Sequence, residues 1–200
     1  MPSISNEQSK IEQGLLNARA QGLTPQELKA GLVADLGYFQ VYCRGVDFGV
    51  NQSGYQIIFK QASDLVPGAA VLAKLEDRIV MIEVYRHTVQ KLVLEIPRGF
   101  SEANELPAKT AERELFEETG LRCSQITPIG RLHPNTGYSS ECIPLFAVMA
   151  NGVPRLTGDE SIKKIVLISI DDFSNLIAND EIMDSFTLAA YTRARLTGWL

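Results

Sequence analysis

A single short helix is predicted in the middle of a chain whose neighbouring segments read as strands, and this arrangement limits the possible folds most. Pro107 suits the first helical position and Gly120 the position just past a helix end, so the helix is expected from Pro107 to about Thr119. Apolar residues recur along it at helical spacing, namely Ala108, Ala111 and Leu115. This apolar stripe is suited to packing on a sheet.

Strand-like segments rich in β-branched and aromatic residues lie on both sides of this helix. The predicted strands are 38–50, 55–62, 69–75, 78–86 and 91–96 before it, and 125–132, 143–150 and 162–170 after it. Two closing helices, separated near Asn179, are predicted within residues 171–196. This order indicates an α+β fold in which helices cover both faces of a mixed β-sheet.

The N-terminal segment has a different pattern. Residues 7–36 carry helical spacing in two pieces, since Gly22 breaks the pattern and Thr24 restarts it as an N-cap followed by proline. We therefore expect residues 1–36 to form an N-terminal helical extension and residues 37–200 to form the main domain. Four acidic residues against three basic ones leave the extension no basic face for DNA, so we expect it to pack on the domain or cap a dimer.

Charge and cysteine usage restrict the partners. The formal net charge of -5 argues against binding to nucleic acid or to an anionic membrane surface, and an anionic substrate would need cations to approach this chain. The first residues show no signal-peptide pattern, and no apolar run is long enough for a membrane span. Three cysteines without metal-type spacing are expected to be buried free thiols, which predicts a cytoplasmic location.

The predicted helix is unusually acidic, with five acidic residues against two basic ones from position 105 to 118. Glu114 and Glu118 are four residues apart and share one helix face, and Glu117 adjoins them. Arg113 precedes Glu117 by four residues and is placed to hold that carboxylate. Two interpretations are open: a solvated acidic surface, or a carboxylate cluster for Mg²⁺ or Mn²⁺.

The spacing of these residues favours the metal site. Residues 99–121 read Gly-x5-Glu-x7-Arg-Glu-Leu-x-Glu-Glu-x-Gly-Leu, which resembles the Nudix box at every specified position. That family hydrolyses nucleoside diphosphates linked to another moiety. The resemblance implies that the box forms a loop–helix–loop in an α/β/α sandwich and that a divalent cation, Mg²⁺ with Mn²⁺ as a substitute, is the cofactor.

The resemblance also implies a role for each box residue. The implied metal-binding groups are the carboxylates of Glu114, Glu118 and Glu117 and the backbone carbonyl of Arg98. Glu117 is either a ligand or a neighbour of the ligands. Arg113 and Glu105 would orient these carboxylates.

Three flanking segments resemble the ADP-ribose or nucleotide-sugar pyrophosphatase branch of the family: 83–99, 133–141 and 164–190. The first implies a substrate site in which Arg86 binds the diphosphate beside Glu95, in the segment that leads to the box. Arg98 stands where alanine is common in the branch, and it either contacts a phosphate or tunes specificity.

The second segment contributes a loop. Glu141 matches the branch's loop glutamate and is our first candidate for the general base, with Glu117 or Glu118 as the alternatives. Tyr138 stacks on a base or ribose of the substrate, or alternatively packs the turn.

The sequence thus predicts metal-dependent hydrolysis of ADP-ribose or a related nucleoside-diphosphate sugar to a nucleoside monophosphate and a sugar phosphate. The alternatives are a dinucleoside polyphosphate, a GDP-sugar, or a non-catalytic sensor of nucleotide sugars. A sensor would be marked by a missing box glutamate, and none is missing. Residues 37–66 are the candidate dimer-forming sheet of the homodimer that the branch commonly forms.

Overall fold

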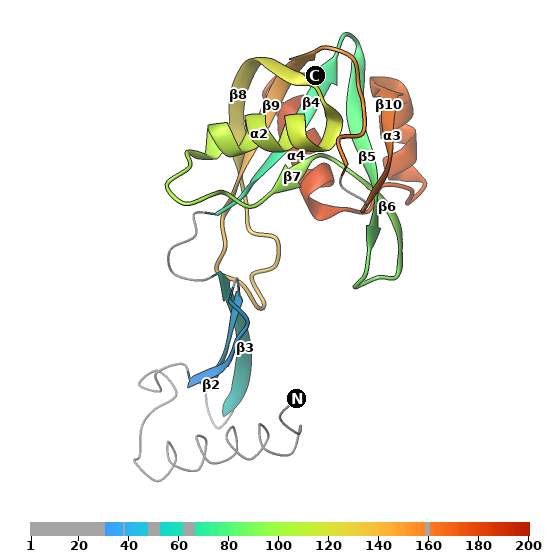
Figure 1. Cartoon of the computed structure of the whole chain (residues 1–200). Coiled ribbons are helices and arrows are strands. Elements are labelled where there is room, and N and C mark those ends of the chain that lie inside the picture. The colour runs from blue at the N-terminus through green and yellow to red at the C-terminus, as the bar shows by residue number, and fades with distance from the viewer. Residues whose placement is uncertain (1–30, 38, 48–52, 62–66, 159–160) are drawn as a thin grey trace. The chain divides into compact units, whose positions relative to one another are not determined.

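The structure, a computed structural model, describes residues 31–37, 39–47, 53–61, 67–158 and 161–200. The chain divides into two compact units, drawn in Figure 1. The first unit contains residues 1–64 and 135–141, and the second contains residues 65–134 and 142–200.

The first unit holds a three-stranded antiparallel sheet in the order β1-β2-β3. Its strands are β1 (Gly31–Asp35), β2 (Phe39–Asp47) and β3 (Ser53–Gln61). The loop 135–141 lies beside β3, where the Phe59 N–H donates to the Tyr138 carbonyl at 2.6 Å. The Gln56 side-chain amide also donates to the Gly137 carbonyl at 2.9 Å.

One prediction for the N-terminal segment is wrong. The helical spacing predicts helix up to residue 36, but Gly31–Asp35 forms β1 and pairs with β2, with Gly31 opposite Cys43 and Asp35 opposite Gln40. Strand pairing in the folded unit overrides the local helical spacing of this short segment. The remainder of the expected helical extension, residues 1–30, lies outside the described residues.

The second unit is built on a seven-stranded sheet, in which β4 and β9 run parallel and the other pairs are antiparallel. The path runs β10-β5-β4-β9-β8, with β6 paired to β5 and β7 to β4. The bounds are β4 (Ala69–Leu75), β5 (Arg78–Arg86), β6 (Lys91–Glu95), β7 (Arg98–Gly99), β8 (Arg122–Leu132), β9 (Ile143–Asn151) and β10 (Ile162–Ser169). The predicted mixed sheet is confirmed.

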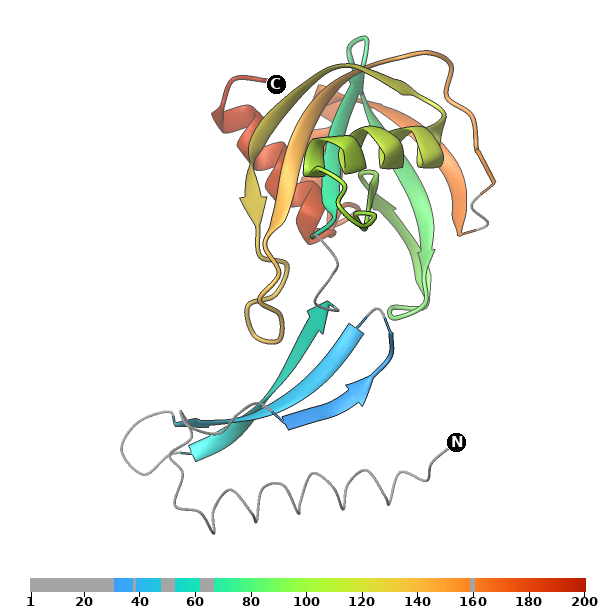
Figure 2. The ribbon, with the colours of Figure 1, turned by 60° about the vertical axis from the view of Figure 1, so that its left-hand side comes forward.

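Helices cover both faces of this sheet, as Figure 2 shows. They are α2 (Pro107–Thr119), α3 (Ile170–Ala178) and α4 (Ser185–Leu196). Alternate residues of β4 serve the two faces: Val71 packs in a cluster with Leu115 of α2, while Leu72 packs in a cluster with Phe173 of α3 and Ala190 of α4. The sandwich therefore has two separate apolar layers, and α2 lies on one of them.

The predicted bounds of α2 are confirmed. Gly120 adopts a left-handed conformation with φ of 71°, and its N–H donates to the Phe116 carbonyl, which ends the helix. The α3 and α4 N-caps are Ser169 and Asp184, whose side chains accept backbone N–H bonds. Among the described residues, no helix combines the length and apolar character needed to cross a membrane.

Candidate active site

Arg113 organises the acidic face of α2. Its Nη1 donates to Glu114 Oε1 at 2.7 Å and to Glu117 Oε2 at 2.8 Å. Its Nε and Nη2 donate to the two oxygens of Glu105 at 3.0 and 2.9 Å, and Nη2 also donates to the Phe100 carbonyl at 2.7 Å. A planar guanidinium suits such multiple recognition of carboxylates. Arg113 therefore fixes three box carboxylates at once and ties them to the loop that precedes the helix.

Glu105 anchors the start of this helix. It accepts bonds from the Glu102 N–H at 3.0 Å and from the Thr110 hydroxyl at 2.9 Å, in addition to Arg113. The hydrogen bond with Arg113 is the main reason that the pKa of Glu105 falls to about 2. Glu105 is thus held ionised, as a partner for Arg113.

Glu114 lies against the backbone of the preceding loop. It is buried, and a Cβ at Gly99 would overlap its carboxyl carbon and both carboxylate oxygens. Only glycine at position 99 leaves room for the carboxylate there. Burial is the main reason that the pKa of Glu114 is raised. Gly99, the first residue of the box, therefore leaves the space that the Glu114 carboxylate occupies.

Glu118 lies beside β7, where its Oε2 accepts a hydrogen bond from the Arg98 backbone N–H at 3.0 Å. Burial, followed by the proximity of Glu114, raises the pKa of Glu118 to about 8. Burial and the neighbouring carboxylates both disfavour the ionised form of Glu118, and a cation bound beside it would favour that form.

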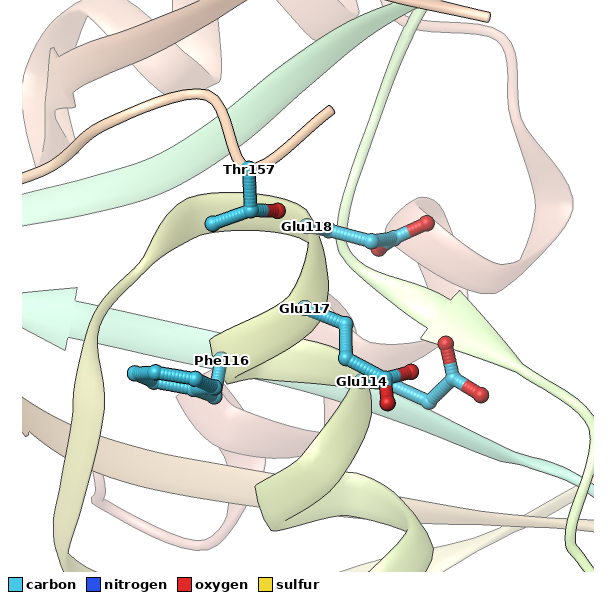
Figure 3. A pocket seen from close by; sticks show the side chains of 5 residues that line it. All are labelled: Glu114, Phe116, Glu117, Glu118 and Thr157. Atoms are coloured by element: carbon cyan, nitrogen blue, oxygen red, sulfur yellow. The ribbon is translucent and has the colours of Figure 1, made fainter. Parts of the chain in front are cut away.

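The three carboxylates share one open pocket with a volume of about 330 Å³. Figure 3 shows Glu114, Glu117 and Glu118 projecting from α2 on one side, with Phe116 on the other. Thr157, from the loop that follows β9, completes the lining. The Arg155 N–H in that loop donates to the Thr119 carbonyl at 2.9 Å, which attaches the loop to the end of α2.

The donor set suits a hard divalent cation. Three carboxylates on one face of a helix, open to a pocket, offer the oxygen ligands that Mg²⁺ and Mn²⁺ prefer. In their present orientations, the acidic, histidine and cysteine side chains of the described residues form no group of three around a common metal position. Arg113 occupies one oxygen each of Glu114 and Glu117, and a carboxylate has about four lone-pair sites, so each retains capacity for a cation.

A second cluster surrounds Glu95, whose side chain is only 1% exposed. Both the Nε and Nη2 of Arg86 donate to it, the former at 3.1 Å, and Arg98 Nη2 donates to it at 3.2 Å. Arg98 Nη2 also reaches Asp184 Oδ1 at 3.4 Å. The side chain of Arg86 is 37% exposed, so it keeps an open surface while Glu95 fixes its direction.

The predicted residues of the loop belong to the first compact unit. Tyr138 is exposed and meets Phe59 edge to face, with ring centroids 6.3 Å apart. The Glu141 N–H donates to the Ser139 hydroxyl at 3.1 Å, and burial is the main reason that the pKa of Glu141 is raised. The structure therefore brings together the predicted residues of the second unit, while the roles of Tyr138 and Glu141 stay predictions.

Some residues of the site were not predicted as such. Asp184, Phe186 and Thr187, at the start of α4, surround Arg98 and the neighbouring backbone. Aspartate is a preferred N-cap residue, so Asp184 could have located the start of α4 but not its contact with Arg98. Phe116 and Thr157 line the pocket without any sequence signal. The three cysteines are free, as predicted, but they are half-buried and not buried.

In this structure, a helix that carries a row of carboxylates packs against a mixed sheet, and Arg113 orders those carboxylates. This is the arrangement that the resemblance to the Nudix family implies. The family model described as NUDIX domain matches residues 64–189, more than half of the chain. The chain belongs to the Nudix family. The predicted family, fold class and enzyme class are thereby confirmed, the last as a hydrolase of the Nudix pyrophosphatase type.

Individual relatives give a finer comparison. An ADP-ribose pyrophosphatase of Bacillus subtilis is 27% identical over 173 residues, which cover 84% of this chain and 88% of that protein. A methanol dehydrogenase activator of Bacillus methanolicus is 36% identical over 132 residues, which cover 62% of this chain and 70% of that protein. A solved structure described as an ADP compounds hydrolase matches with a TM-score of 0.72 at 18% identity, covering 86% of this chain and 94% of that one. The chain thus resembles the ADP-ribose pyrophosphatase branch.

Proposed function

We propose that this protein hydrolyses the pyrophosphate bond of ADP-ribose or a related nucleoside-diphosphate sugar, and that the reaction depends on Mg²⁺ or Mn²⁺. The products are a nucleoside monophosphate and a sugar phosphate. The observation that carries the proposal is the set of three box carboxylates that Arg113 orders at one open pocket. The similarity to ADP-ribose pyrophosphatases supports the substrate class.

Glu114, Glu117 and Glu118 would hold the cation. When bound there, a divalent ion neutralises the diphosphate, polarises phosphorus and lowers the pKa of the attacking water. Arg113 keeps the carboxylates of Glu114 and Glu117 in fixed directions, so the site is ordered before substrate arrives.

Arg86 would bind the diphosphate. Its guanidinium forms a charge-assisted pair with the buried Glu95 and keeps an exposed surface for phosphate oxygens. The water oxygen forms a new bond to phosphorus, the bridging P–O bond breaks, and the second phosphate leaves. We propose that Glu141 accepts the proton of the attacking water, with Glu117 or Glu118 as the alternatives.

We also propose that the protein is a cytoplasmic homodimer and that β1–β3 contribute to the dimer. Exposed apolar side chains on this small sheet, Ile57 and Phe59, support an interface there. Light scattering coupled to gel filtration measures the mass, and a monomer at micromolar concentration would contradict the homodimer.

A substrate panel tests the function. ADP-ribose, other nucleoside-diphosphate sugars and dinucleoside polyphosphates are incubated with Mg²⁺, and products are identified by mass in ¹⁸O-labelled water. We expect AMP and ribose 5-phosphate from ADP-ribose, with one ¹⁸O atom in one of the two. Glu118→Gln, which removes the charge of one proposed metal ligand, should lower turnover of the accepted substrate. Glu112→Gln is its matched control, because Glu112 lies on the same helix and pairs with Lys109 outside the pocket. Binding of a nucleotide sugar without turnover of any compound would favour the sensor instead.

A further inference from the structure

A three-residue segment links the two helical layers of the second unit. The Ile96 N–H donates to the Thr187 hydroxyl of α4 at 3.0 Å, and the Arg98 N–H donates to Glu118 of α2 at 3.0 Å. Between them, the Pro97 carbonyl accepts the Val71 N–H of the central strand β4 at 2.9 Å. Figure 1 shows β7, which begins at Arg98, in the region of both helices. The segment therefore touches a box carboxylate on one side and α4 on the other.

The start of α4 holds this segment through two residues. Asp184 Oδ2 accepts both the Thr187 N–H at 2.9 Å and the Thr187 hydroxyl at 2.8 Å. The Thr187 hydroxyl has one proton, which it gives to Asp184, so its lone pair is directed to the Ile96 N–H. Thr187 is fully buried, so the loss of any of these hydrogen bonds would leave a buried polar group unsatisfied and would destabilise the fold.

Arg98 forms the second connection from α4. Its Nη2 donates to Asp184 Oδ1 at 3.4 Å, and its guanidinium lies 4.3 Å from the centre of the Phe186 ring. The same side chain bonds Glu95 at 3.2 Å. Both ends of the Ile96–Arg98 segment are thus fixed from the start of α4, one through the backbone and one through a side chain.

We propose that Asp184 and Thr187 are positioning residues for the active site. They fix the Ile96–Arg98 segment, and the Arg98 N–H then fixes one oxygen of the carboxylate of Glu118, which is a proposed metal ligand. This inference rests on the proposed function. Partners that orient a metal ligand commonly change metal affinity or activity by about 10- to 100-fold when they are removed.

Two substitutions separate this role from simple helix capping. Thr187→Val keeps the shape of the side chain but removes the hydroxyl that Ile96 uses. Asp184→Asn keeps an N-cap acceptor but removes the charge opposite Arg98. Ser169→Ala is the matched control, because it removes the N-cap of α3, where Ser169 bonds the Asp172 N–H. Thr187→Ser restores the hydroxyl and should restore the wild-type behaviour.

Three measurements are made on the full chain: the melting temperature, Mn²⁺ affinity by electron paramagnetic resonance, and exchange protection of the Arg98 amide in metal-free protein by NMR. Thr187→Val is expected to weaken Mn²⁺ binding by about 10-fold or more and to reduce Arg98 protection, and Asp184→Asn to do so to a smaller extent. Ser169→Ala is expected to lower the melting temperature by about 2–4 °C, while Mn²⁺ binding and Arg98 protection stay unchanged.

The outcomes are distinguishable. Unchanged Arg98 protection and Mn²⁺ affinity in both α4 variants, with a lower melting temperature, would mean that Asp184 and Thr187 only cap the helix, and the inference would be overturned. If Thr187→Val does not fold, Arg98 protection and Mn²⁺ affinity in Asp184→Asn decide between the two roles. If wild-type protein neither binds Mn²⁺ nor hydrolyses any diphosphate while Arg98 protection still depends on Thr187, the proposed function fails and the fixing of the segment stands.

Discussion

Replacing Gly99 by alanine should displace a single carboxylate. The new Cβ would overlap the carboxyl carbon and both oxygens of Glu114, which form the mobile end of its side chain, so the overlap is relieved by displacing this carboxylate from the position in which Arg113 holds it. Restoring van der Waals contact requires a retreat on the order of 1 Å, and a misplacement of that size costs about 10²-fold in rate. At about 1.36 kcal/mol per tenfold, this is about 2.7 kcal/mol of transition-state stabilisation.

The effect of Gly99→Ala on the stability of the fold should be separable from its effect on turnover. Overpacking typically destabilises a fold by about 1–3 kcal/mol, and for a chain of this size each kcal/mol lowers the melting temperature by about 2–4 °C. Gly31→Ala is the control, because a Cβ there would meet nothing closer than the Cys43 carbonyl at 3.9 Å. Turnover and Mn²⁺ affinity are measured well below the melting temperature. A folded Gly99→Ala protein with wild-type kcat and Mn²⁺ affinity would refute the reasoning that the glycine exists to place Glu114.

Further predictions concern the metal, the acid–base groups and the loop. Excess chelator should abolish hydrolysis and Mg²⁺ or Mn²⁺ should restore it; turnover that continues in chelator would exclude metal dependence. Glu118→Gln should lower kcat by at least ~10²-fold, whereas Glu112→Gln should leave it near the wild-type value. Because the folded-state pKa of Glu118 is raised from 4.5 to about 8, metal-free protein should lose stability as the pH rises through this range. Glu118→Gln, which does not ionise, should therefore melt above wild type at pH 8 in chelator and near it at pH 4.5, as measured by differential scanning fluorimetry; equal melting temperatures at both pH values would contradict the shift. Glu141→Gln should lower kcat by ~10²- to 10⁴-fold with little change in substrate affinity, and full recovery at high Mg²⁺ would show a metal ligand in place of a base.

Local signals in the sequence were sufficient to predict most helices and strands of the second unit. Pro107 and Gly120 act on their own backbone and their neighbours, so they define α2 without any knowledge of the fold. The strand 78–86 was predicted with its observed bounds, because residues such as Ile82 and Val84 favour strands and turn residues precede them. The fixed spacing of the box made the acidic face interpretable as a metal site.

Features that depend on distant partners were not predictable in this way. The strand Gly31–Asp35 exists through its pairing with β2, which the helical spacing of its own residues does not reveal. The two-residue strand Arg98–Gly99 is too short to show any period. The bond from Ile96 to Thr187 joins residues 91 positions apart, so no local pattern could indicate it. In the second unit, the missed contacts are long-range ones that join the segment before the box to the start of α4.

The charge balance of the site explains why these acids gather in an acidic protein. Three arginines of the second unit face six carboxylates: Arg86, Arg98 and Arg113, against Glu95, Glu105, Glu114, Glu117, Glu118 and Asp184. Each guanidinium is already paired, so the arginines alone cannot make this region attractive to a diphosphate. Burial and neighbouring negative charge already oppose ionisation of Glu118. The same negative charge would repel an anionic substrate that approaches the pocket. Divalent cations held by the carboxylates would turn this repulsion into attraction. On this reasoning, substrate affinity in chelator should fall together with turnover, and a wild-type affinity for ADP-ribose without metal would contradict it.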